Sequence, residues 1–138
     1  MKLSKTFRDI IVNEIEFVVT KMKESAEIEK KIFYFSAIPA ELLRVFNLEY
    51  DPDLLYIQHI INATHVAFQQ RIAAIQRGDT VVPITNEQMD SLEYSSVELG
   101  NRFKENKKMD DILREFIILS YSTSGNGYYL MQKGLLEI

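Results

Sequence analysis

The sequence has no cysteine and few of the residues that interrupt regular structure. Without cysteine, disulfide frameworks, thiolate nucleophiles and zinc sites with cysteine ligands are excluded. Only five glycines and three prolines occur among 138 residues. Because turns between short strands rely on these two residue types, their scarcity favours long helices. The composition, 46% hydrophobic and 26% charged, is that of a folded chain, and the length fits one domain spanning residues 1–138.

Long apolar segments are also missing. The N-terminal stretch MKLSKTFRDIIVNEIEF has no uninterrupted apolar core, so it does not have the pattern of a signal peptide. No window reaches the roughly 18 uncharged apolar residues of a membrane-spanning helix. The nearest, residues 56–78, contains both histidines and two arginines. We therefore expect a cytoplasmic protein that does not associate with membranes, and the lack of cysteine is compatible with a reducing compartment.

The charge balance is acidic, with a formal net charge of −4. A nucleic-acid-binding surface needs concentrated basic residues to displace counterions. The segment RFKENKK supplies the best candidate, with Arg102, Lys104, Lys107 and Lys108. Basic residues near the end of a helix also complement the helix dipole in solvent, and this second interpretation is favoured. Nucleic-acid binding is accordingly the least favoured functional hypothesis.

The spacing of apolar residues predicts an all-α fold. Residues 4–31 have the pattern of a long amphipathic helix that begins at Ser4 as its N-cap, because apolar side chains recur at steps of three and four. Pro39 disfavours helical geometry at Ile38 and predicts a break near this position. A short second helix is then expected over residues 39–47, with the proline in its first turn.

The third predicted helix, residues 52–77, is the one with least charge. Asp51 is expected to cap its N-terminus, Pro52 suits the first helical position, and Gly78 is expected to end it. Its apolar residues form two bands on different sides, which indicates a central helix buried between neighbours.

A capping box predicts the start of the fourth helix. In TNEQ, the Thr85 side chain can accept from the backbone of Gln88, whose own side chain can reach back. On the inner face of this helix, Ser96 and Gly100 lie one turn apart. Their small size predicts the close approach of another helix.

The remaining sequence predicts one or two further helices. Asp110 or Asp111 is expected to cap a fifth helix that contains ILREFIILSYS. STSGNG breaks the chain, and residues 128–138 are expected to form a short terminal helix. The sequence therefore predicts a single bundle of five or six helices with a long N-terminal helix.

Catalytic and metal-binding motifs are not found. His59 and His65 are the only histidines, and six residues of helix separate them by about 120° of rotation, so they cannot share one ion. No Glu-x-x-His or His-x-x-x-His spacing is present. General acid–base catalysis by a carboxyl group needs a pKa raised by apolar surroundings, and no pair of carboxylates lies within an apolar stretch of the sequence. We predict no catalytic residue, no metal and no cofactor, and an enzyme is not favoured.

A strip of neutral polar residues on the third helix is the main candidate site. Its members cluster within about 60° on a helical projection. They are Gln58, Asn62, His65, Gln69 and Gln76. The strip has three interpretations: an exposed edge or interhelical polar seam, an oligomer interface in which amides fix the register, and the polar wall of a ligand pocket. His65 is its one group that can change charge near neutral pH.

Three functional hypotheses follow. The first is a non-enzymatic protein that self-associates as a homodimer and acts through protein contacts. Its interface would combine the first helix, the third-helix strip and two aromatic residues, Tyr128 and Tyr129, since Tyr is enriched in interfaces. The second is a small-molecule-binding bundle in which Gln58, Asn62, His65 and Gln69 orient a ligand. The third is the nucleic-acid binder described above.

Overall fold

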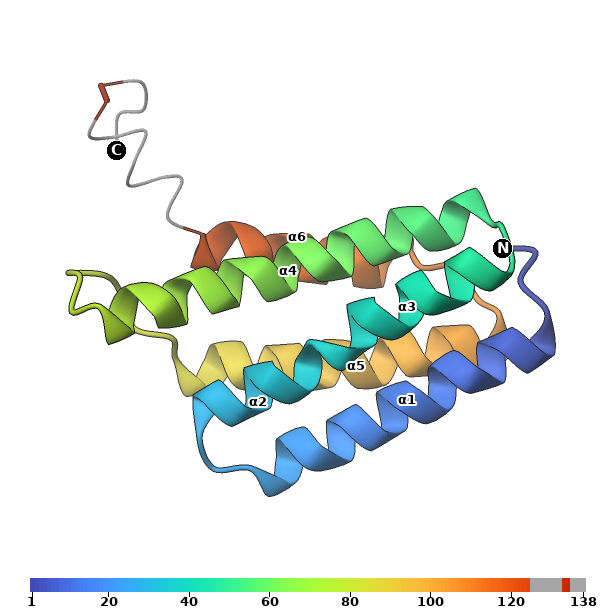
Figure 1. The fold of residues 1–138 in the computed structure, drawn as a ribbon, viewed down its shortest axis with the longest axis horizontal. Coiled ribbons are helices and arrows are strands. Elements are labelled where there is room, and N and C mark those ends of the chain that lie inside the picture. The colour runs from blue at the N-terminus through green and yellow to red at the C-terminus, as the bar shows by residue number, and fades with distance from the viewer. Residues whose placement is uncertain (125–132, 135–138) are drawn as a thin grey trace.

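The fold is an all-α bundle, as predicted (Figure 1). The computed structural model describes residues 1–124 and 133–134, and these contain six helices and no strand. The helices are α1 (Lys5–Glu24), α2 (Ile28–Phe35), α3 (Ala37–Leu48), α4 (Pro52–Gln76), α5 (Asn86–Glu105) and α6 (Asp110–Thr123). None of the helices in the described part of the chain is long and apolar enough to cross a membrane.

Five of the helices form a closed ring in which each packs against two others. Helix α1 lies against α5, α5 against α6, α6 against α4, and α4 against α3, which returns to α1. Helices α2 and α3 are separated by Ser36 alone and run on in the same direction as one kinked rod (Figure 1). Helix α4 contacts α3 and α6, but it is not buried on both sides as predicted, because Tyr56 and Ala63 of its second apolar band are exposed.

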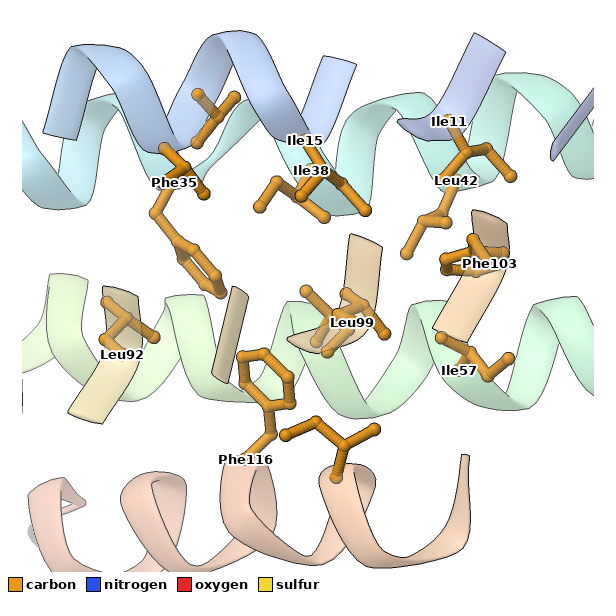
Figure 2. Packing of buried hydrophobic residues seen from close by; sticks show 14 of the residues in the cluster. Ile11, Ile15, Phe35, Ile38, Leu42, Ile57, Leu92, Leu99, Phe103 and Phe116 are labelled. Carbon is orange, nitrogen blue, oxygen red and sulfur yellow. The ribbon is translucent and has the colours of Figure 1, made fainter. Parts of the chain in front are cut away.

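The core fills the space inside this ring. Four phenylalanines from four different helices are fully buried: Phe35, Phe68, Phe103 and Phe116. Figure 2 shows Phe35 of α2 and Phe116 of α6 meeting across the core, and their rings stack with centroids 6.2 Å apart. Ring packing across the bundle therefore ties together helices that are distant in the sequence.

The first helix is shorter than predicted. Ser4 caps it, its side chain accepting from the Phe7 backbone at 3.3 Å, but α1 ends at Glu24 and a separate helix begins at Ile28. The prediction of one helix to residue 31 was wrong because Ile28 and Ile32 continue the apolar spacing after the turn. Periodicity alone does not distinguish one long helix from two helices that bury the same stripe.

The break predicted near Pro39 is found. It falls at Ser36, and Ile38 is helical although a following proline disfavours helical geometry. Pro39 lies in the first turn of α3, as expected, but the helix runs from residue 37 to 48. Because proline lacks an N–H, the carbonyl of Phe35 has no donor four residues later, which places the interruption at that turn.

Most of the predicted helix ends are confirmed. Asp51 caps α4 by accepting from the Asp53 backbone at 2.9 Å, and Gly78 follows the helix with a φ of +83°. Thr85 and Gln88 form both hydrogen bonds of the capping box. Helix α5 ends at Asn106, which has left-handed backbone geometry.

The cap predicted for the last described helix was wrong. Met109 is the N-cap of α6 and contributes no side-chain hydrogen bond, while Asp110 and Asp111 lie in its first turn. At these positions both carboxylates interact favourably with the positive end of the helix dipole, but neither caps the helix. The helix predicted over residues 128–138 lies outside the described residues, apart from Lys133 and Gly134.

Candidate functional site

The polar strip of α4 follows the edge of that helix's buried face. Gln58 is the innermost member: it is buried, and its Nε2 donates to the carbonyl oxygen of Pro39 in α3 at 3.3 Å. This bond ties α4 to α3 where Pro39 begins a helical turn. At Gln58 the strip is therefore an interhelical polar seam.

The other predicted residues are less buried. Asn62 and Gln69 are exposed, and His65 is half-buried beside the ring of Phe35, with centroids 6.3 Å apart. Burial lowers the pKa of His65 from its ordinary value, because desolvation disfavours the charged imidazolium. The structure thus places the four predicted residues in three different environments and does not bring them together as one site.

A groove between α2 and α4 collects the second half of the strip. Its volume is about 480 Å³, and His65, Gln69 and Gln76 form its α4 wall. Ile32 and Phe33 of α2 lie on the opposite side. The groove combines neutral hydrogen-bonding groups with apolar surface, but Gln58 and Asn62 do not line it. Within the described residues, no cluster of three potential metal ligands is present.

An apolar seam runs along the outside of α4 and α6. A shallow groove of about 270 Å³ is lined by Tyr56, His59, Ile60 and Ala63 of α4 and by Ile117 and Ser120 of α6. The side chains of Tyr56 and Ile117 are 60% and 47% exposed. Tyr121, one turn beyond Ile117, is 74% exposed. We refer to these seven residues as the α4–α6 seam.

Two hydroxyl groups hold the helices of the seam together. Thr64 Oγ1 donates to the carbonyl oxygen of Phe116 at 3.0 Å, or to that of Ile60 on its own helix, and Ser120 Oγ donates to the carbonyl oxygen of Ala63 at 3.4 Å. Thr64 is fully buried. The seam is therefore a fixed surface made by two tied helices.

The seam contains no formal charge. No Asp, Glu, Lys or Arg occurs between Asp53 and Arg71, which is most of α4. The outer face of α1 also exposes aromatic surface, at Phe17, but Lys21 lies over that ring, with its Nζ 5.7 Å from the ring centroid. An exposed apolar surface without charge is found along α4 and α6, and α1 presents a mixed one.

Two of the four basic residues near the end of α5, Arg102 and Lys107, pair with acids of the same chain. Arg102 pairs with Asp111 through two hydrogen bonds of 2.5 and 3.0 Å, which lower the pKa of Asp111 to about 2. Lys107 lies 2.7 Å from Glu105 and holds the pKa of that carboxyl below its usual range. Nucleic-acid binding gains no support from this arrangement, because these cations already have counter-charges.

The last predicted interface residues, Tyr128 and Tyr129, lie outside the described residues. The seam residues on α6 were not predicted as a site. Within α6, residues 116–119 are four consecutive apolar residues, so their spacing does not indicate which of them face outward.

Comparisons with known proteins provide no relative. No protein-family model, no curated protein and no solved structure matches this chain. Functional inference therefore rests on the surfaces described above.

Proposed function

We propose that the protein is a non-enzymatic cytoplasmic protein that self-associates as a homodimer through the α4–α6 seam and acts through protein contacts. The observation that carries the proposal is the exposure of Tyr56, Ile117 and Tyr121 on one uncharged surface. Aromatic residues concentrate, and charged residues are depleted, at the buried centre of protein interfaces. A cysteine-free chain is compatible with the reducing cytoplasm.

A second copy of the chain is the partner that this surface fits best. In a two-fold symmetric dimer the same patch meets itself, so any charge at its centre would face a like charge. The seam avoids this conflict because its lining residues are uncharged. An acidic chain with net charge −4 needs such a neutral surface to approach its own copy closely.

The charges at the two ends of α4 favour an antiparallel arrangement. Asp53 stands in its first turn, and Arg77 follows its last. When two α4 helices cross antiparallel about a two-fold axis, the acidic end of each faces the basic end of the other, and this attraction adds to the pairs that Asp53 and Arg77 form within the chain, with the N-terminal ammonium and Asp79. The helix dipoles are then also opposed. Ala63, near the middle of α4, is small and exposed and permits close approach at the axis.

Light scattering coupled to size exclusion tests the proposal, with the chain at tens of micromolar. The full chain is expected to elute as a dimer, and Ala63→Glu, which places two carboxylates near the axis, is expected to elute as a monomer. Ala40→Glu is the matched control, because Ala40 is an exposed helical alanine on α3, away from the seam. A wild-type monomer, or an Ala63→Glu variant that remains dimeric, contradicts the proposal.

A further inference from the structure

A third groove lies beyond the seam, where the last turns of α4 meet the connector to α5 and the end of α6. Its volume is about 730 Å³, within the range of small-molecule sites. Ala67, Ala74, Val81 and Val82 contribute apolar surface. The alanines make the groove possible, because larger side chains at these positions would fill it.

Two arginines supply the positive charge of this groove. Arg71 and Arg77 line it, and its lining residues include no carboxylate. Arg77 lies 2.9 Å from Asp79, which is outside the lining. Arg71, in contrast, has no carboxylate partner among residues 1–124 and 133–134.

Backbone carbonyls hold the guanidinium of Arg71 in place. Its Nη1 donates to the carbonyl oxygen of Val82 at 2.5 Å, and its Nη2 donates to that of Thr123 at 2.7 Å. These carbonyls and that of Ser124, 3.4 Å from Nη2, are neutral, so within the described residues no counter-charge faces Arg71. A guanidinium carries five N–H donors, and those not used here remain for a ligand. A fixed cation beside an apolar surface is suited to bind an anion that also has a hydrocarbon part.

We propose that this groove binds a small amphiphilic anion, an aliphatic carboxylate whose head accepts hydrogen bonds from Arg71 and whose chain lies on Ala67, Ala74 and Val81. The charge complementarity of the lining carries the choice: a cationic ligand would meet two arginines, and an uncharged one would supply no counter-charge to Arg71, which has none among the described residues. The site is separate from the α4–α6 seam, so it does not depend on self-association.

Isothermal titration of the full chain with octanoate, and in parallel with 1-octanol, tests the proposal. Octanoate is expected to bind with one site per chain and about tenfold more tightly than octanol, since hydrogen bonds between two charged groups are stronger than those to a neutral hydroxyl. Arg71→Gln is expected to remove this preference while octanol still binds. That second readout separates loss of charge from collapse of the groove.

A pair of matched substitutions locates the site. Val82→Asp adds a carboxylate at the rim and is expected to weaken octanoate binding by about tenfold. Leu48→Asp makes the same kind of change at an equally exposed residue, 72% against 71%, outside the groove, and is expected to have no effect. Ala63→Glu is expected to bind octanoate like the wild type, so failure of the dimer proposal leaves this one intact.

Two results would overturn the proposal. The first is equal affinity for octanoate and octanol in the wild-type chain, which would show that Arg71 plays no part. The second is the absence of saturable octanoate binding to the full chain.

Discussion

Gly100 of α5 lies so close to Ile15 of α1 that a β-carbon on the glycine would be 3.1 Å from Cγ2 of the isoleucine. Ser96, one turn earlier, is fully buried on the same face. The close approach predicted from these two small residues is therefore found, and α1 is the helix that approaches. The separation of the two helices is set at this contact.

The first prediction concerns Gly100. Alanine gains about 1 kcal/mol of helix propensity but crowds Ile15, so Gly100→Ala is expected to change the free energy of unfolding by less than about 1 kcal/mol. Gly100→Leu is expected to lower it by about 3 kcal/mol, because α1 must move away. Urea denaturation measures both. Ile15→Leu removes the branched Cγ2, so the crowding explanation requires Gly100→Ala to be more favourable in that background.

The second prediction concerns a pair that joins α2 to α5. Lys31 Nζ lies 2.6 Å from Glu93 Oε1 and also donates to the carbonyl oxygen of Met22 at the end of α1. Both side chains are about 15% exposed. Glu93→Gln leaves the ammonium without its counter-charge and is expected to lower the free energy of unfolding by about 1–3 kcal/mol.

Replacing both partners separates the cost of an unpaired charge from the value of the pair. The double variant Lys31→Met and Glu93→Leu is expected to return to within about 1 kcal/mol of the wild type. Lys30→Met removes the exposed pair with Glu27 and serves as the control, with an expected change below about 0.5 kcal/mol. Equal losses for the Lys30 and Glu93 variants would show that burial of the pair has no effect.

The third prediction concerns pH and His65. Burial lowers its pKa in the folded state below the ordinary 6.5, so the unfolded chain takes up the proton first as the pH falls. The folded state is therefore expected to lose stability from about pH 6.5 down to the lowered pKa of His65. His65→Gln removes this contribution and is expected to lose less stability between pH 7.5 and pH 5.

Urea denaturation at the two pH values measures that difference. His59→Gln, which removes an exposed imidazole from the same helix, provides the reference against which the His65 effect is compared. An equal pH dependence in the two variants would contradict a specific role for the burial of His65.

Local signals in the sequence identified most of the fold. Asp51, Gly78 and the capping box at Thr85 were predicted because each satisfies backbone groups next to it in the chain. The turn between α1 and α2 was missed because the apolar spacing continues across it, and because one of its contacts joins Lys31 to Glu93, 62 positions away. Ser25 and Lys31 both donate to carbonyls at the end of α1, and Lys31 also pairs with α5.

The candidate site was only partly predictable for the same reason. The projection of α4 placed Gln58 and Gln69 on one strip, about 20° apart. Their burial differs because α3 covers the first half of that edge while an open groove beside α2 follows the second. The arginine-lined groove could not be predicted at all, because Arg71 reaches Val82 and Thr123 only after α4 and α6 have packed.

The closed ring of helices also constrains the order in which the chain can fold. Helix α1 meets α2 and α3 early, but its other neighbour is α5, and the hydrogen bond from Arg8 to Phe103 spans 95 positions. Loop closure over such a distance is slow. During synthesis, the face of α1 that carries Ile15 therefore stays uncovered until most of the chain has left the ribosome, and this uncovered face is the surface from which misassembly would start.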